Sequence, residues 1–266
     1  MRLRIAVELD YHFPQPADVL LAVEVAQLPE QRLVEDLLTI DGVGPLRPIA
    51  GEEGIGRRTW MRADGPFSAR YGATVDVRRD PPSFEGLEPV PRRDLPAEVI
   101  PYIWPSRYCE SDRFETFVAR TFDGVEGGAM LAAMAEWIHQ RLEYVPGSSD
   151  ASTTAADVFV ARQGVCRDYA HLFAAFARAA GVPARLVSAY GLKVDPPDFH
   201  ALVEVWLGGA WHLIDPSRPG PVEAVVRICV GRDATDIAFM SSFGPAEMVA
   251  QKVEVTRLDE GPSAME

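Results

Sequence analysis

The hydrophobic residues of this 266-residue chain change their spacing once, near residue 105. Before that point apolar and polar residues alternate, as in residues 3–9 and 67–77, and a period of two is typical of a strand that buries one face. After it, apolar residues recur every three or four positions, as in residues 114–122 and 131–142, which indicates amphipathic helices. The pattern predicts an all-β part, then helices, then an antiparallel sheet, and hence an α+β fold.

A proline-rich segment separates the two parts. Residues 81–105 contain seven prolines, and because proline has no backbone N–H to donate, regular strand pairing is not expected there. We therefore predict two domains: residues 1–105, a β-rich, sandwich-like domain with this connector, and residues 106–266, which begin with helices. Within the first domain, ADGP at residues 63–66 predicts a turn ahead of a strand.

Capping residues place two helix starts in the second domain. Ser111 precedes the apolar stripe of residues 114–122 and is of a type that opens helices. Thr154 and Asp157 have nearly the spacing of a capping box, which predicts a short helix there.

The bulk composition argues against several classes of function. The chain has 39 acidic and 26 basic residues and a net charge of −13, so its field opposes binding to nucleic acid and to anionic membranes. No apolar stretch is long enough for a signal peptide or a membrane span, and we expect a cytoplasmic protein. Three widely spaced cysteines without a CxxC pair do not predict a disulfide frame or a zinc ribbon.

The clearest helix prediction covers residues 165–181 and places Cys166 at its start. Gly181 suits the position after the helix, and Pro183 prevents its continuation. The first turn of a helix carries unpaired N–H groups and the positive end of the helix dipole, and both favour a thiolate over a thiol. The same N–H groups can hold the oxyanion of an acyl intermediate. Cys166 is therefore a candidate nucleophile.

A hairpin is predicted after this helix. The dipeptide Gly208-Gly209 separates two alternating segments and predicts a two-residue turn, because glycine adopts positive φ without strain. In such a turn Leu207 pairs with Ala210. The strands expected in this region are residues 184–190, 200–207 and 211–214.

The predicted register decides which histidine a carboxylate can orient. Asp215 lies diagonal to His200 on one face of the hairpin, about 7–8 Å away at the backbone, a distance that two side chains can close. His212 points to the opposite face, and His171 projects from a different side of the helix than Cys166. The residues therefore predict His200 as the base for Cys166 and Asp215 as its orienting carboxylate. A three-residue turn would remove this register.

Other readings of these residues remain open at this point. A lone cysteine at a helix start and a buried His–Asp pair are both common as structural features. A metal site made of Cys166, His200 and Asp215 has no short ligand spacing to support it. The acidic loop at residues 193–199 offers two carboxylates, fewer than the six to eight oxygens that calcium takes. We expect no metal and no cofactor. We also expect Cys109 and Cys229 to have no role in catalysis.

Three blocks of sequence resemble the transglutaminase-like superfamily, in particular bacterial members that include proteins described as cysteine proteases. They are QGVCRDYAHLFAAFARAAGVPARLVSAYG, DFHALVEVWLGGAWHLIDPS and RICVGRDATD. The resemblance implies that residues 106–266 form a papain-like transglutaminase core, with Cys166 as nucleophile, His200 as general base and acid, and Asp215 as orienting carboxylate. Ala201 departs from the family, in which an aromatic residue often follows the histidine.

The function expected on this basis is a cysteine-dependent amide-bond hydrolase or acyl transferase that works through a thioester. Its partner would be a peptide or protein amide, and the oligomeric state is left open. Hydrolysis is favoured slightly over transfer. A cytoplasmic crosslinking enzyme would need its activity restrained, and no segment of the chain looks like a pro-segment that could do so. One alternative is a catalytically silent scaffold or protein-interaction module whose N-terminal domain binds a partner. Another is acyl transfer from a thioester such as acetyl-CoA, as in arylamine N-acetyltransferases, although the acidic charge disfavours a phosphate-rich ligand.

Overall fold

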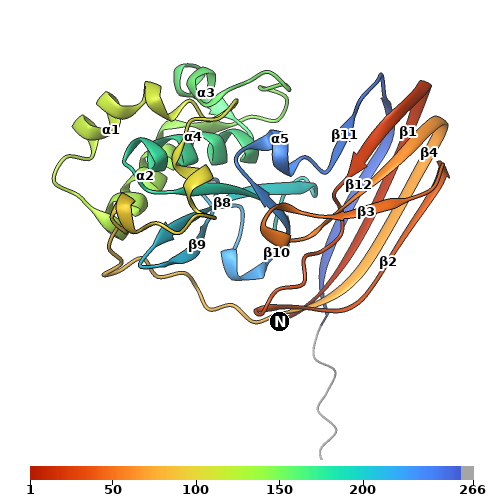
Figure 1. Cartoon of the computed structure of the whole chain (residues 1–266), viewed down its shortest axis with the longest axis horizontal. Helices are drawn as coiled ribbons and strands as arrows, with labels where there is room; N and C mark the ends of the chain where they lie inside the picture. Colours follow the sequence, from red (N-terminus) through yellow and green to blue (C-terminus); the bar gives the residue numbers. More distant parts are fainter. Residues whose placement is uncertain (259–266) are drawn as a thin grey trace, which may run out of the picture.

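The structure is a computed structural model and describes residues 1–258. It combines a six-stranded and a four-stranded antiparallel sheet with a group of helices (Figure 1). The predicted α+β fold is confirmed. None of the helices in the described part of the chain is both long and apolar enough to cross a membrane.

The first sheet is built on two long strands. Strand β1 (Arg2–Leu21) pairs with β4 (Arg57–Val77) along nearly its whole length, and β2 (Gln31–Val43) and β3 (Arg47–Ala50) pair with the other edge of β4. The alternation read from the sequence is the reason for the strand, because every second side chain from Leu3 to Phe13 and from Ala17 to Leu21 is buried, while the residues between them are exposed or partly exposed. The buried side chains at the start of β1 are Leu3, Ile5, Val7 and Leu9.

The end of the chain completes this first sheet. Strand β12 (Glu247–Leu258) pairs with the first half of β1, and β11 (Met240–Ser242) pairs with its last three residues. Figure 1 accordingly shows the blue C-terminal strands beside the red N-terminal one. The predicted division into residues 1–105 and 106–266 does not account for this pairing. Strands β11 and β12 belong to residues 106–266 but lie in the sheet formed by residues 1–105.

The predicted sandwich and turn take a different form. Residues 1–105 are antiparallel β as expected, but they form one sheet, and its buried face shares one continuous hydrophobic core with the second half of the chain. The turn predicted at residues 63–66 is wrong, because these residues lie inside β4. Gly65 has a φ of 72° at the place where the register of β1 with β4 shifts, so its conformational freedom serves a bulge.

The helices follow a connector without strands at residues 81–105. Thr154 and Asp157 form the predicted capping box at the start of α3. Ser111 begins a short 3-10 turn instead of capping α1, which starts after Phe114. The helices are α1 (Glu115–Thr121), α2 (Gly127–Arg141), α3 (Ala155–Ala161), α4 (Cys166–Ala179) and α5 (Ala234–Ile237). Helix α4 is central, and its apolar face is fully buried.

The second sheet lies against α4 and has the order β10-β7-β8-β9. Its hairpin turns at Gly208 (φ 57°) and Gly209 (φ 84°), and Leu207 pairs with Ala210. The predicted two-residue turn and its register are confirmed. The strands are β7 (Ala184–Gly191), β8 (Phe199–Leu207), β9 (Ala210–Ile214) and β10 (Val225–Gly231). A separate parallel pair joins β5 (Glu143–Tyr144) to β6 (Gln163–Gly164).

Candidate active site

Cys166 is the first residue of α4, and the N-terminus of this helix is capped by one of its own side chains, Asp168. Val165, at the capping position, has an extended backbone and no polar side chain. The carboxylate of Asp168 turns back and accepts a hydrogen bond from the Val165 N–H at 2.8 Å and another from the Ser149 hydroxyl at 2.5 Å. The amides of Cys166 and Arg167 precede the first hydrogen bond of the helix, so they have no partner within α4. The helix start therefore presents two N–H groups beside the sulfur.

Gly164 makes this arrangement possible. A Cβ atom at this position would lie 2.7 Å from the Cβ of Asp168, closer than real side chains approach. Gly164 also pairs with Tyr144 in the parallel bridge between β6 and β5. The two residues that precede Cys166 thus lock the helix start against β5.

His200 and Asp215 form the buried pair that the hairpin register predicted. The Nε2 atom of His200 donates to Oδ2 of Asp215 at 2.6 Å, and the side chains are 1% and 2% exposed. The other carboxylate oxygen accepts hydrogen bonds from the hydroxyl of Ser217 at 2.7 Å and from the backbone N–H groups of Ser217 and Arg218. Asp215 is therefore fixed on both oxygens and in turn fixes the imidazole.

The charges around His200 favour its protonated form. Burial on its own would lower the pKa of His200, but the hydrogen bonds and charges of Asp215 and Cys166 raise that pKa to about 10. Burial opposes ionisation of Asp215, whereas the hydrogen bonds from His200 and Ser217 bring the pKa of Asp215 below its ordinary value. Nδ1 of His200 is buried and has no conventional hydrogen-bond partner among residues 1–258. With Nε2 held by Asp215, Nδ1 is the ring atom left for Cys166.

Tyr144 is a site residue that the sequence reasoning missed. Its hydroxyl lies beside Cys166, where it interacts with both the backbone amide and the thiol, and burial together with this thiol raises the pKa of Tyr144 to about 12. Its ring packs 5.9 Å from that of Tyr169. Strand β5 has only two residues, too few to show a hydrophobic period, so the sequence pattern gives no sign of Tyr144.

Two hollows adjoin the Cys166–His200 pair. The larger, of about 320 Å³, is lined by Cys166 and His200 together with residues from the loop before β8 and from α5. The smaller, of about 210 Å³, is lined by His200, Tyr144, Lys193, Val194, Asp195, Ser217 and Pro219. His200 borders both hollows, whereas Cys166 borders only the larger one, so His200 lies between the two.

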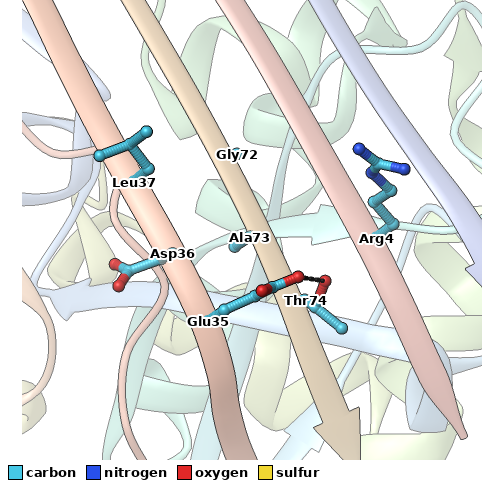
Figure 2. A pocket seen from close by; sticks show the side chains of 7 residues that line it. All are labelled: Arg4, Glu35, Asp36, Leu37, Gly72, Ala73 and Thr74. Atoms are coloured by element: carbon cyan, nitrogen blue, oxygen red, sulfur yellow. Dashed lines mark hydrogen bonds between the residues drawn. The ribbon is translucent and has the colours of Figure 1, made fainter.

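A third hollow, on the first sheet, has a different character. It crosses β1, β4 and β2, and Figure 2 shows Glu35 reaching over β4 to accept a hydrogen bond from Thr74 at 3.0 Å. Its lining contains no thiol and no imidazole. The residues are Arg4, Glu35, Asp36, Leu37, Gly72, Ala73 and Thr74. This hollow therefore has no group suited to nucleophilic catalysis.

His171, His212 and the two other cysteines line neither of the hollows beside Cys166 and His200. His171 is fully buried, stacks on Tyr108 at 5.2 Å and accepts a hydrogen bond from the Ala234 N–H at 3.1 Å. His212 bonds through Nε2 to the carbonyl of Leu207. Burial raises the pKa of Cys109 and of Cys229 to about 12. In the part of the chain that the structure describes, no three His, Cys, Asp or Glu side chains are arranged to hold a metal ion.

Comparison with known proteins relates this geometry to one family. The family model described as the transglutaminase-like superfamily matches residues 119–216, which include Cys166, His200 and Asp215. The crystal structure of a "putative cysteine protease" from Cytophaga hutchinsonii is 34% identical and superimposes with a TM-score of 0.92 over 97% of this chain and 91% of that chain.

Curated relatives cover less of the chain. An uncharacterized protein of Mycobacterium leprae is 33% identical over 142 residues, which are 48% of this chain and 50% of the relative. An uncharacterized protein of Mycobacterium tuberculosis is 35% identical over 95 residues, which are 35% of this chain and 30% of the relative. The matched part thus spans half or less of the length of these relatives.

Proposed function

This chain belongs to the transglutaminase-like superfamily, and from that premise we propose that it hydrolyses an amide bond through a thioester on Cys166. The observation that carries the proposal is the position of His200. It is buried, held through one ring nitrogen by Asp215, and left with the other nitrogen free beside a cysteine that opens a helix. Such a set of nucleophile, base and orienting carboxylate is what acyl transfer by a cysteine requires.

The chemistry runs in two steps. The thiolate of Cys166, stabilised by the imidazolium of His200 and by the start of α4, attacks the carbonyl carbon of the amide. His200 gives its proton to the leaving nitrogen, the C–N bond breaks, and an amine departs from the thioester. His200 then takes a proton from water, the resulting hydroxide attacks the thioester, and the carboxylic acid and the Cys166 thiolate are released.

Two donors are available for the oxyanion of each tetrahedral intermediate. One is the backbone amide of Cys166, and the other is the hydroxyl of Tyr144, which interacts with that amide and the thiol in the free protein. A carbonyl oxygen that enters between them receives both hydrogen bonds. The raised pKa of Tyr144 keeps its hydroxyl protonated, and therefore a donor, at neutral pH.

A screen of amide substrates with matched variants tests the proposal. Short peptides, glutamine-containing peptides with an amine, and simple acyl amides are incubated with the wild type and with Cys166→Ala, His200→Asn and His212→Asn. His212 lies in the same hairpin as His200 but bonds to the backbone of Leu207, so it is the control. We expect amide cleavage that is lost in the first two variants and kept in the third. Equal activity in the wild type and in Cys166→Ala would refute the proposal.

Labelling of the cysteines provides an independent measurement. Cys109 and Cys229 are fully buried, whereas Cys166 borders a hollow. Brief treatment with iodoacetamide should therefore add one group, at Cys166, as read by intact mass and peptide mapping. Acceptance of an amine in place of water, with a new amide as the product, would assign the protein to acyl transfer instead of hydrolysis.

A further inference from the structure

The larger hollow beside Cys166 has flat apolar walls. The rings of Phe199 and Phe239 stack at 4.3 Å with an angle of 2° between their planes, and Tyr108 contributes a further ring to the lining. Much of the remaining lining consists of small side chains, which leave the space beside the stacked rings open. They are Ala151, Ser188, Ala201, Ala234 and Ala238. A hollow of this shape suits an unbranched aliphatic or planar side chain.

Apart from His200, two charged side chains line this hollow, and only one of them has a partner of opposite charge. The guanidinium of Arg167 contacts the fully buried carboxylate of Asp168 at 3.5 Å and donates to the backbone of Asp150 at 2.8 Å. Asp198 accepts only from neutral donors, the N–H of Phe199 at 2.7 Å and the amide of Gln251 at 2.6 Å. Both bonds go to Oδ1, and within residues 1–258 no cation forms an ion pair with Asp198.

The first sheet holds this carboxylate in place. Gln251 belongs to β12, so the strand that returns to the N-terminal sheet fixes Asp198 two residues before His200. The residue is solvent-exposed on one side and lies at the rim of the hollow. Partial burial raises the pKa of Asp198 above its ordinary value, and the hydrogen bonds from Phe199 and Gln251 oppose this shift.

We infer that the larger hollow binds a cationic side chain of the polypeptide substrate, an ammonium or guanidinium on an aliphatic stem, and that Asp198 selects it. The stem lies along the Phe199–Phe239 pair, and the cation reaches the free oxygen of Asp198 at the rim. The bound residue lies next to the amide that Cys166 attacks. This inference rests on the proposed function for its substrate, but the charge preference of the hollow can be measured without it.

The first experiment uses the thiol of Cys166 as the probe. Methanethiosulfonate reagents transfer a thioalkyl group to the sulfur and release methanesulfinate, and they exist with a trimethylammonium or a sulfonate head group. The ratio of the two second-order rate constants is measured for the wild type, Asp198→Asn, Asp198→Lys and Asp123→Asn. Asp123 is an exposed carboxylate between α1 and α2, so the last variant removes the same charge elsewhere.

We expect the cationic-to-anionic ratio to fall about five- to tenfold in Asp198→Asn, and further in Asp198→Lys, because one unit charge at close range is removed or reversed. Asp123→Asn should stay within about twofold of the wild type, because long-range charges are screened. A ratio that is the same in Asp198→Asn as in Asp123→Asn would overturn the inference. Because each ratio compares two reagents on one protein, a change in thiol reactivity cancels.

The second experiment uses peptides that differ only in charge. Amide substrates carrying lysine or arginine are compared with those carrying norleucine or citrulline, and kcat/KM is measured for each variant. The preference for the charged member should fall about tenfold in Asp198→Asn and partly in Gln251→Leu, which keeps the carboxylate but removes its support. An Asp198 effect confined to an amine acceptor would overturn the assignment to the substrate side chain.

The two experiments separate failure of the inference from failure of the proposed function. If the wild type cleaves no peptide while the thiol reagents still depend on Asp198, the proposed hydrolysis is wrong and the cation preference stands. If peptides are cleaved and neither experiment depends on Asp198, the hydrolysis stands and the cation preference is wrong.

Discussion

Strand β8 carries two buried polar sites four residues apart, and they are built differently. At one end His200 bonds to a single carboxylate and leaves its second ring nitrogen free beside Cys166. At the other end both oxygens of Glu204 accept hydrogen bonds from arginines, Arg185 at 2.7 Å and Arg227. Both sites are almost completely hidden from solvent. The second joins β7, β8 and β10 and, through Arg227, reaches Glu30 in the connection between β1 and β2 of the first sheet.

A buried charge alone therefore does not indicate chemistry. The carboxylate of Glu204 is engaged on both oxygens by fixed arginines, which is how a structural ion pair avoids the cost of burial. His200 keeps one buried polar atom without a conventional partner, and that atom is free to serve a nucleophile beside a hollow. An unpartnered nitrogen next to a thiol therefore points to function, and a carboxylate engaged on both oxygens points to stability.

The largest effect expected from this comparison is that of Asp215→Asn. The amide keeps the volume but cannot stabilise an imidazolium, and it allows the ring to take the wrong tautomer, so kcat/KM should fall about 10³- to 10⁴-fold. The measurement is the rate on whichever amide the screen identifies, with circular dichroism to confirm folding. A loss of less than about tenfold would place the His200–Asp215 pair with Glu204 among structural pairs.

The fold and the site differ in how much of each could be predicted. The turn at Gly208-Gly209 fixes the hairpin within a few residues, so the link between His200 and Asp215 followed from local rules. The start of α4 could likewise be predicted from residues close to it in the sequence. Strand β12 was not predicted to join β1, because pairing between segments some 240 residues apart leaves no mark in either segment.

The place of Tyr144 beside Cys166 and the anchoring of Asp198 were not predicted, for one physical cause. Tyr144 is brought to Cys166 by a two-residue parallel bridge, and Asp198 is fixed by Gln251 from the returning strand. Neither contact has a period or a turn motif that sequence reasoning can use. The wrong turn prediction at residues 63–66 has a related reason. Gly65 adopts a positive φ, which suits a turn and a bulge equally well, and only the pairing with the partner strand decides between them.

Glu204→Gln tests the other half of the comparison. Removing the charge leaves Arg185 and Arg227 buried beside a neutral amide, and the free energy of unfolding should fall by about 3 kcal/mol. Activity per folded molecule should stay within about threefold of the wild type, since Glu204 borders neither hollow. Denaturant titration and rates at matched folded concentration measure the two quantities. A large loss of activity with unchanged stability would show that Glu204 serves activity, as His200 does, and is not a structural ion pair.

The pH dependence of stability separates two buried histidines. His200 has its pKa raised from 6.5 to about 10, so its stabilisation is fully present below pH 6.5 and is lost as the pH rises through about 10. The expected slope is a loss of about 1.4 kcal/mol per pH unit in that range. Burial lowers the pKa of His171 from 6.5 to about 3, so its effect has the opposite sign and stability is lost as the pH falls below 6.5.

Denaturant titrations at a series of pH values test both slopes. His200→Asn should flatten the alkaline side, because an asparagine binds no proton, while the acidic side is kept. Measurements between pH 6.5 and 8 avoid the titration of tyrosines and lysines. If His200→Asn leaves the alkaline slope unchanged, folding adds no net proton to the Cys166–His200 pair between pH 6.5 and 8.

Ser217→Ala should have the smallest effect and shows how firmly Asp215 is held. The hydroxyl of Ser217 is one of three donors to Oδ1, and the backbone N–H groups of Ser217 and Arg218 remain in the variant. Loss of one neutral hydrogen bond to a charged acceptor should lower kcat by about three- to tenfold, with KM nearly unchanged. The pH at which kcat falls should also shift, because this hydrogen bond helps to lower the pKa of Asp215. A decrease as large as that of Asp215→Asn would mean that the hydroxyl, and not the backbone, positions the carboxylate.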